Sequence, residues 1–369
     1  MLKIGIDVYS ALHYPRGMGI YTINFLKYLA QIDKNNQYIL YGNVEDVNNV
    51  LPKQDNFRYR NLGVNYLICY EQFALPKACK EDDIDILHSP ANTSPFFLDK
   101  KIKRILTLHD VMCLKKEVPF PKHKRQFFGR FYYAFTTVLN APRAEKILTV
   151  SNYSKEDISK TLKINKEKII LTFNGHEHFD ISNATSIEEL QKKYQIPTDY
   201  YFHLGGEAPT KNTEFLLKYF VKHQDKNIVI AGIRNLEISH LYANYNKYNN
   251  IKFIPYIPQE DIVGLYMNAK AFLFASLYEG FGIPLLEAMK CSCPIISSNA
   301  TCLPEVAGDA ALYFYPHDIN TFSEQIQILE KDDNLRQKLL KKGQERHNIF
   351  CWQNSAKIIH EVYAEICKE

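Results

Sequence analysis

Two acidic residues, Glu279 and Glu287, lie on either side of a glycine-rich turn, and their type and spacing point most directly to chemistry. The turn follows an apolar run and leads into a predicted helix, so it gathers backbone N–H groups and the positive end of a helix dipole at one point. Such a point suits a phosphate, and carboxylates accept hydrogen bonds from hydroxyl groups. The spacing therefore indicates a ligand that carries both phosphates and hydroxyl groups, as a nucleotide sugar does.

The turn itself consists of Gly280, Phe281, Gly282 and Ile283. We expect its N–H groups to face the ligand, because glycine lets the backbone approach closely. Pro284 lacks an N–H but suits the first helical position, which places Glu287 in the first turn of the helix. A carboxylate there either binds a ribose diol or complements the helix dipole, and the residues alone leave both interpretations open.

Length and composition bound the architecture that must position these residues. At 369 residues and 46% hydrophobic content, the chain is long enough for two domains, each with its own core. Residues 1–9 resemble a first strand rather than a signal segment, and no apolar run approaches the roughly 18 residues of a membrane span. The eight cysteines lack the paired spacing of a metal site. We therefore expect a cytoplasmic protein without a structural metal.

The segment from Lys100 to Lys146 is strongly basic, with twelve Lys and Arg against three acids, although the whole chain carries only +4. Its interleaved aromatic residues are Phe120, Phe127, Phe128, Phe131, Tyr132, Tyr133 and Phe135. Such a segment suits a helix that lies on an anionic membrane surface. It equally suits a solvated helix whose aromatic residues face the core, so both interpretations stay open. Nucleic-acid binding is not expected, because no recognised module accompanies the charge.

Short apolar strands alternate with helical stretches along the chain, which is typical of parallel α/β sheets. In the first half the predicted strands are Leu2–Val8, Tyr38–Tyr41, Ile86–His88, Ile105–His109, Lys146–Val150 and Ile169–Phe173. In the second half they are Tyr201–Leu204, Ile228–Ala231, Ile251–Ile254, Ala271–Ala275, Pro294–Ser297 and Leu312–Tyr315. The polar segment Asp180–Thr198 separates the halves and is the expected linker.

Both halves open with a strand, a glycine loop and a helix. The first loop holds Gly17, Met18 and Gly19, and the second holds Gly205 and Gly206. Ligands of doubly wound sheets bind outside the carboxyl ends of the strands, so two such domains face to face would enclose a ligand cleft.

Several motifs together carry a resemblance to a known family. They are Tyr256-Ile-Pro258, the run from Phe272 through Ser276-Leu-Tyr-Glu279-Gly-Phe-Gly282-Ile-Pro284 to Met289, and Leu303-Pro-Glu305. This second half resembles the donor-binding domain of glycosyltransferase family 4. Thr107-Leu-His109-Asp110, Pro209-Thr-Lys211-Asn212 and Trp352 agree with it, so the resemblance covers essentially the whole chain. Gly17-Met18-Gly19, His88-Ser-Pro90 and His109-Asp110 are most similar to the bacterial mannosyltransferases that build surface polysaccharides.

The resemblance implies the α/β GT-B fold, with two facing Rossmann-like domains and a cleft between them. Residues 1–180 would form the acceptor-side domain and residues 181–350 the donor domain, with the helix at 351–369 packed back on the first. It also implies a retaining hexosyltransferase that needs no cofactor beyond its nucleotide-sugar substrate, here expected to be GDP-mannose. No protein nucleophile is required, since the departing phosphate can take the acceptor's proton.

The resemblance also assigns roles to individual residues. Glu287 would bind the ribose, and Glu279 would lie beside the donor sugar as a catalytic residue. Lys211 would neutralise the leaving diphosphate. The remaining donor contacts would come from the Gly280–Ile283 turn, from Gly17, Met18 and Gly19, and from the backbone near Tyr256.

Two residues of the first half complete the expected catalytic set. His109 would end a strand and contact the donor sugar; the alternative is a core histidine bonded to a backbone carbonyl. Asp110 would act as a base on the acceptor side.

The chain departs from the family at the phosphate clamp. Many members carry an arginine a few residues before the lysine or next to it, where this chain has Gly205, Gly206 and Thr210. Threonine does not replace arginine at a bidentate site. Arg16 and Arg234 are candidates to compensate.

We therefore expect a retaining transferase that moves mannose onto a growing, lipid-linked saccharide in bacterial surface polysaccharide synthesis. It would work in the cytoplasm, peripherally on the inner face of the membrane. Two alternatives stay open: a non-hydrolysing sugar-nucleotide 2-epimerase, and a catalytically impaired saccharide-binding subunit.

Overall fold

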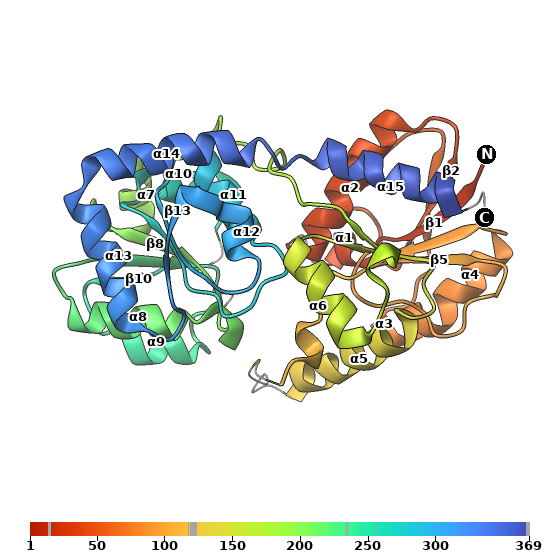
Figure 1. Ribbon diagram of the computed structural model, residues 1–369, viewed down its shortest axis with the longest axis horizontal. Coiled ribbons are helices and arrows are strands. Elements are labelled where there is room, and N and C mark those ends of the chain that lie inside the picture. The colour runs from red at the N-terminus through yellow and green to blue at the C-terminus, as the bar shows by residue number, and fades with distance from the viewer. Residues whose placement is uncertain (14–15, 117, 119–123, 234, 256, 367–369) are drawn as a thin grey trace. The chain divides into compact units, whose positions relative to one another are not determined.

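The computed structural model of the protein describes residues 1–13, 16–116, 118, 124–233, 235–255 and 257–366. The chain divides into two units, shown in Figure 1. Unit 1 comprises Met1–Lys115, Lys122–His178 and Cys351–Glu369, and unit 2 comprises Lys116–Pro121 and Phe179–Phe350. Among the residues so described, no helix is both long and apolar enough to cross a membrane.

Unit 1 is built on a sheet of seven parallel strands in the order β3-β2-β1-β4-β5-β6-β7. The strands are β1 (Lys3–Asp7), β2 (Gln37–Gly42), β3 (Phe57–Asn61), β4 (Ile86–Ser89), β5 (Lys103–Thr107), β6 (Lys146–Thr149) and β7 (Ile169–Leu171). The helical segments are α1 (Tyr9–His13), α2 (Met18–Ile32), α3 (Leu67–Cys69), η1 (Tyr70–Ala74), α4 (Leu75–Glu81), η2 (Met112–Leu114), α5 (Lys124–Asn140), α6 (Asn152–Leu162), η3 (Lys166–Lys168) and α15 (Trp352–Ile366).

Unit 2 is built on a sheet of six parallel strands in the order β10-β9-β8-β11-β12-β13. The strands are β8 (Tyr201–Leu204), β9 (Ile228–Ala231), β10 (Ile251–Phe253), β11 (Phe272–Phe274), β12 (Ile295–Ser298) and β13 (Ala311–Phe314). The helical segments are α7 (Ile187–Tyr194), η4 (Pro209–Lys211), α8 (Thr213–Lys222), α9 (His240–Tyr245), α10 (Gln259–Asn268), α11 (Ile283–Lys290), α12 (Leu303–Ala307), η5 (Gly308–Ala310), α13 (Ile319–Lys331) and α14 (Asp333–His347).

The central strands of both sheets are buried along their whole length, as in β4 and β9. Helices therefore cover both faces, which explains why these strands are continuous apolar runs. Most predicted strands lie within one or two residues of the observed ones, and β8 and β9 match them fully. The sequence did not predict β3, because this strand lies at the sheet edge and only its Phe57 is buried, so it lacks an apolar run.

The last helix, α15, packs on α2 within unit 1. The Glu177 carboxylate accepts the N–H of Trp352 at 2.9 Å, at the first residue of α15. Gly175 lets the two segments meet, because a Cβ there would lie 2.3 Å from that same backbone nitrogen. Further along the helix, the Tyr363 hydroxyl lies 2.6 Å from Nδ1 of the buried His88 on β4.

The polar segment Asp180–Thr198 is more ordered than a linker. It contains α7, whose first turn is capped by Ser186. Lys193 and Thr185 both bind the buried carboxylate of Asp261 on α10, at 2.5 and 2.6 Å. The segment is therefore fixed to unit 2 by charge-assisted hydrogen bonds.

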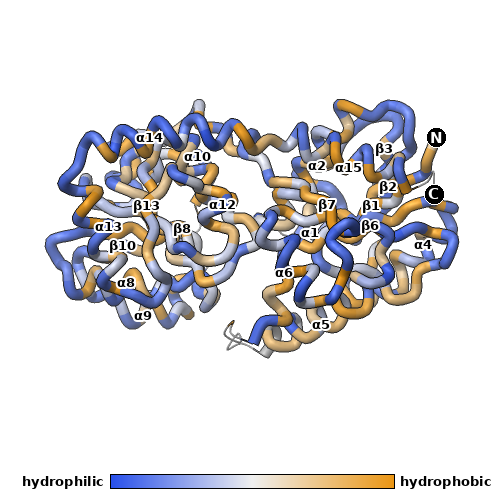
Figure 2. The backbone as a smooth tube through the Cα atoms, in the orientation of Figure 1, coloured by the Kyte–Doolittle hydropathy of each residue, from blue (hydrophilic) through white to orange (hydrophobic). Residues whose placement is uncertain are grey.

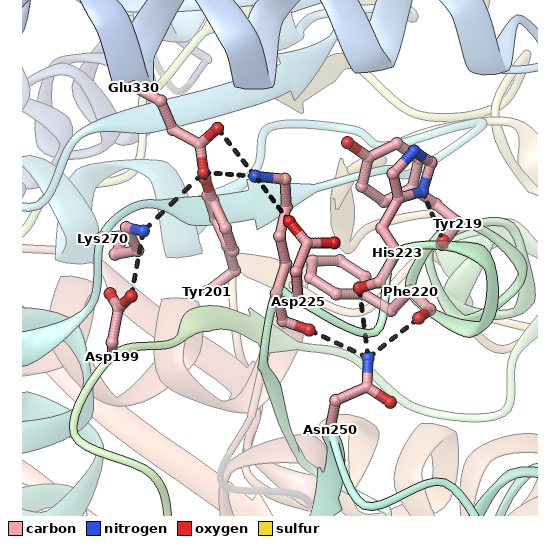
Figure 3. Close-up of polar contacts among 10 residues, drawn as sticks. Asp199, Tyr201, Tyr219, Phe220, His223, Asp225, Asn250, Lys270 and Glu330 are labelled. Atoms are coloured by element: carbon pink, nitrogen blue, oxygen red, sulfur yellow. Dashed lines mark hydrogen bonds and ion pairs between the residues drawn. The ribbon is translucent and has the colours of Figure 1, made fainter.

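A second polar network lies at the amino-terminal edge of the unit 2 sheet (Figure 3). Glu330 of α13 accepts the Tyr201 hydroxyl at 2.8 Å and both of its oxygens lie 2.8 Å from the Lys226 ammonium. The Lys270 ammonium lies 3.7 Å from the same carboxylate. Burial alone would raise the pKa of Glu330, but the hydrogen bonds from Lys226 and Tyr201 hold it below its ordinary value of 4.5.

We predict that Glu330→Gln lowers the free energy of unfolding by about 1 kcal/mol at pH 7, because a partly exposed ion pair contributes little more. Since the pKa is lowered in the folded state, the contribution is present above about pH 4.5 and disappears as the pH falls through the folded-state pKa. Urea denaturation at pH 7 and pH 3.5 measures both values.

The exposed Glu324 on the same helix provides a matched control. Glu324→Gln should change the free energy of unfolding by less than about 0.5 kcal/mol at either pH. An equal loss in both variants, or a loss in Glu330→Gln that does not shrink in acid, would contradict the assignment.

Candidate functional site

The strand order of unit 2 reverses between β8 and β11, and the residues after these two strands form the candidate site. Ligands of open parallel sheets bind outside the carboxyl ends of the strands at such a switch point. The segment Gly205–Lys211 follows β8, and the segment Ala275–Gly282 follows β11. Hereafter these are the β8 loop and the donor loop.

Two contacts connect the loops. The Leu277 N–H donates to the Thr210 carbonyl at 2.7 Å, and the Lys211 ammonium lies 2.7 Å from Oε1 of Glu279. The ammonium also lies 5.5 Å from the ring centre of Phe274. The exposed fractions are 29% for the Lys211 side chain and 17% for that of Glu279, so both remain open to a ligand. The structure thus brings together two residues that are 68 positions apart.

The donor loop ends where α11 begins. Gly282 adopts a φ of +96°, which L side chains rarely adopt, and a Cβ there would lie 2.9 Å from Cδ2 of Leu303. The first residue of α11 is Ile283, so Pro284 occupies the second position rather than the first. The prediction that Glu287 lies in the first turn was wrong, because that turn contains no acidic residue.

Glu287 is 8% exposed and accepts the Tyr266 hydroxyl at 3.1 Å. Burial and the neighbouring Glu287 carboxylate raise the pKa of Tyr266 well above its ordinary value, so the hydroxyl remains a donor. A dipole-complementing acid is exposed in the first turn, whereas this one lies deeper and is held by a second element. Its burial and its hydrogen bond with Tyr266 distinguish it from a solvated residue at a helix start.

The other turn residues sit as follows. Gly280 is buried, and Phe281 is buried with its ring 5.5 Å from that of Phe350, in an edge-on contact. The Phe281 side chain therefore faces the core of unit 2.

His109 lies two residues beyond the end of β5, in unit 1, and not at the end of the strand as predicted. Its Nε2 lies 2.9 Å from the Pro90 carbonyl, and its N–H donates to Oδ1 of Asn92 at 2.7 Å. Burial lowers the pKa of His109 to about 4, so the ring is neutral at pH 7. A carbonyl only accepts, so Nε2 carries the proton and Nδ1 is left as an acceptor. This geometry is the core-histidine alternative, and it still leaves one ring nitrogen to accept a hydroxyl.

Asp110 is half-buried and has a local structural role. Its Oδ1 accepts the N–H of Met112 at 2.9 Å, at the start of η2. One carboxylate oxygen is thus occupied by the turn that follows.

The first glycine loop begins α2 in unit 1. Gly17 adopts a φ of +49° with open space where a Cβ would lie, so glycine is needed there for conformation rather than for room. The Gly19 N–H donates to the Arg16 carbonyl at 3.0 Å, and Met18 is the first residue of the helix. Arg16 is exposed.

Tyr256 and Arg234, both named from the sequence, lie outside the described residues. Within unit 2 the structure pairs Lys211 with Glu279, and the turn between the glutamates leads from Glu279 to the helix that carries Glu287. Sequence reasoning missed Tyr266 as the partner of Glu287, and no local pattern signals it, because the two lie on different helices.

Comparisons with known proteins follow this division of the chain. Residues 15–179 match the family Glycosyltransferase Family 4, and residues 186–346 match the family Glycosyl transferases group 1. The chain is 29% identical over 280 residues to O-antigen chain mannosyltransferase B of Escherichia coli, covering 73% of this chain and 71% of that protein. It is 24% identical to the serotype-specific mannosyltransferase WbdA of Escherichia coli, but the match spans only 34% of that longer protein.

Among solved structures, sucrose-phosphate synthase from Thermosynechococcus elongatus superposes with a TM-score of 0.76 at 17% identity, over the full length of both chains. This likeness gives the fold, which is GT-B. Both family matches describe glycosyltransferases, which favours that class over the epimerase. With one match on each half, the chain belongs to the glycosyltransferases that join a Glycosyltransferase Family 4 domain to a Glycosyl transferases group 1 domain.

Proposed function

We propose that this glycosyltransferase moves mannose from GDP-mannose to a saccharide acceptor with retention of configuration. The observation that carries the proposal is the Lys211–Glu279 ion pair at the switch point, in the same unit as the glycine-rich start of α11 and the buried Glu287. It combines a cation for phosphates with carboxylates for hydroxyl groups.

Lys211 would neutralise the diphosphate as the glycosidic bond breaks, without a metal ion. Glu279 would orient sugar hydroxyls and stabilise positive charge at the anomeric carbon. Glu287 would accept both hydroxyls of the ribose, with its rotamer fixed by Tyr266.

His109 would accept a donor-sugar hydroxyl through Nδ1, because Nε2 is already engaged by Pro90. Asp110 would contact the saccharide acceptor. The departing phosphate takes the acceptor's proton, so no protein nucleophile is assigned.

The choice of mannose rests on the relatives, which include two mannosyltransferases of Escherichia coli. The name of the first also places it in O-antigen chains, which supports a growing surface polysaccharide as the acceptor class. Product analysis without an acceptor separates transfer from epimerisation, since only an epimerase would change the donor's sugar.

We expect Glu287 to bind the ribose of GDP-mannose. Glu287→Gln should therefore weaken GDP-mannose binding tenfold or more, because charge-assisted hydrogen bonds contribute roughly 1.5–3 kcal/mol. GDP-mannose should raise the thermal midpoint of the wild type, whereas UDP- and dTDP-sugars should raise it less. Titration calorimetry with GDP then gives the affinities.

Two ligands test whether Glu287 contacts the ribose. Inorganic pyrophosphate, which has no ribose, should bind wild type and Glu287→Gln equally. The wild type should prefer GDP to 2′-deoxy-GDP, and the variant should not. A variant that keeps this preference would show that Glu287 does not bind the diol.

We further predict that Lys211→Ala and Glu279→Gln have different effects on GDP affinity. Lys211→Ala removes the cation and should weaken binding more than tenfold. Glu279→Gln frees Lys211 from its ion pair and removes a negative charge near the phosphates, so GDP affinity should hold or rise. Mannose transfer by Glu279→Gln should nevertheless fall about a hundredfold.

Lys218→Ala, on the exposed face of α8, controls for the loss of a lysine and should leave GDP affinity unchanged. Weaker GDP binding in both site variants would mean that the pair acts as a structural unit. Unchanged binding in Lys211→Ala would remove the lysine from the diphosphate site.

We also propose that unit 1 contacts an anionic membrane surface through α5, which would present a lipid-linked acceptor on the inner face of the membrane. The helix is apolar on its outer side: the exposed fractions of Phe128, Phe131 and Phe135 are 69%, 52% and 58%. In Figure 2 much of α5 is coloured as hydrophobic, whereas α14 is largely hydrophilic.

The inner side of α5 is polar instead. Tyr132 donates to the buried Glu71 carboxylate, and Asn140 donates to the Ser94 carbonyl at 2.6 Å. A soluble helix normally has the reverse arrangement, so an exposed aromatic stripe of this kind suggests a surface that is covered in use.

Several cations of the basic segment face inward. Lys115 pairs with Asp157, Lys146 pairs with Glu365, and Arg130 donates to the Cys113 carbonyl. The aromatic stripe therefore supports the membrane proposal better than the charge count does. Phe120 lies outside the described residues.

We predict that replacing Phe128, Phe131 and Phe135 together by serine reduces binding to phosphatidylglycerol vesicles more than tenfold, since each buried aromatic contributes roughly 1.5–3 kcal/mol. Flotation of the full chain measures the bound fraction. Ile238→Ser, at a 78% exposed position of unit 2, should bind like the wild type. Equal recovery of the triple variant and the wild type would refute membrane contact by α5.

A further inference from the structure

Glu279 is held by its main chain as well as by its side chain. Its N–H donates to Oγ1 of Thr301 at 3.1 Å, and its carbonyl accepts the Cys302 thiol at 3.2 Å. Both partners come from the turn that leads into α12. The peptide groups on both sides of the candidate catalytic carboxylate are therefore fixed by one neighbouring turn.

The same turn supports the far end of the donor loop. Cys302 and Leu303 are fully buried. Cδ2 of Leu303 packs against Gly282, because a Cβ added to that glycine would lie only 2.9 Å from it. The turn thus contacts the donor loop at Glu279 and again at Gly282, immediately before α11.

Thr301 has a backbone conformation that threonine seldom adopts. Its φ is +50°, in the left-handed region where asparagine and glycine are common and a β-branched residue is an outlier. Such a conformation persists only where the surroundings enforce it, and it is frequent at functional sites. The hydroxyl is the part of the side chain that makes the contact with Glu279.

We propose that Thr301 is a positioning residue, which fixes Glu279 for the reaction without touching the donor itself. This inference rests on the proposed role of Glu279. The carboxylate has to stay in place when the diphosphate draws Lys211 away from it, and the hydrogen bonds that the Glu279 main chain makes with Thr301 and Cys302 hold its backbone at that moment.

The test compares Thr301→Val, which keeps the shape but removes the hydroxyl, with Thr301→Ser, which keeps the hydroxyl. Thr301→Val should lower kcat about three- to tenfold, which is the value of one hydrogen bond. Its GDP affinity should match that of the wild type, because the Lys211 and Glu287 contacts remain. Thr301→Ser should retain the wild-type kcat, and so should Thr198→Val, which removes an exposed hydroxyl elsewhere in unit 2.

A second pair covers the case in which valine prevents folding. Asparagine and glycine both tolerate a positive φ, but only asparagine offers an oxygen to the Glu279 N–H. Thr301→Asn should therefore be more active than Thr301→Gly. Equal activity within both pairs would overturn the inference.

Two further measurements separate this inference from the proposed function. Hydrogen exchange should show faster exchange of the Glu279 amide in Thr301→Val than in the wild type, whether or not a substrate is known. In a Glu279→Gln background, Thr301→Val should reduce kcat no further, since it acts through the glutamate. A full additional loss there would overturn the inference, whereas a wild type that binds no nucleotide sugar would overturn the proposed function instead.

Discussion

The ion pair between Lys211 and Glu279 is the interaction on which the site in unit 2 depends. It exists because parallel strands deliver their following loops to the same edge of a sheet, and the strand order reverses between β8 and β11. The Leu277–Thr210 backbone hydrogen bond sets the register of the two loops, and the side chains then meet at 2.7 Å. Lys211, proposed to bind phosphate, and Glu279, proposed to contact the sugar, therefore neutralise each other before a ligand binds.

The two units share a parallel-sheet architecture but differ in the role of their polar contacts. In unit 2 the polar contacts at the amino-terminal edge, around Glu330, stabilise the sheet, while those at the carboxyl edge remain partly open to a ligand. In unit 1 a buried acid, Glu71, is satisfied by Tyr132 of α5 and by Thr93, and burial raises its pKa to about 7. Because the polar side of α5 packs against the rest of unit 1, several of its phenylalanines are exposed to solvent.

Sequence alone predicted much of this where the signal is local. The donor loop and the start of α11 were predictable, because glycine, proline and the glutamates stand within a few residues of one another. Helix α7 was missed, since its segment was predicted as a linker, although the pair Ser186 and Glu189 has capping-box spacing and the Glu189 N–H donates to Ser186 at 3.2 Å. What the residues could not supply were contacts across the chain, such as Tyr266 with Glu287 or Thr301 with Glu279, since only the tertiary fold creates them. The pairing of Lys211 with the donor site came from family resemblance rather than from spacing.

The structure explains why no arginine stands at position 205, where this chain has Gly205. A Cβ there would lie 2.0 Å from Nε2 of His203, so no larger residue fits beside that buried ring. His203 is held by the Leu273 carbonyl and by Thr213, at 2.8 and 3.1 Å, and burial together with the nearby Lys211 cation lowers its pKa to about 4. The imidazole is therefore neutral and adds no charge to the site. Among the described residues of the β8 loop, Lys211 is the cation available to a diphosphate. The partial positive charge at the start of α11 would assist it. Because Glu279 already holds that lysine, a diphosphate that took the lysine would release the Glu279 carboxylate, which we propose then contacts the sugar.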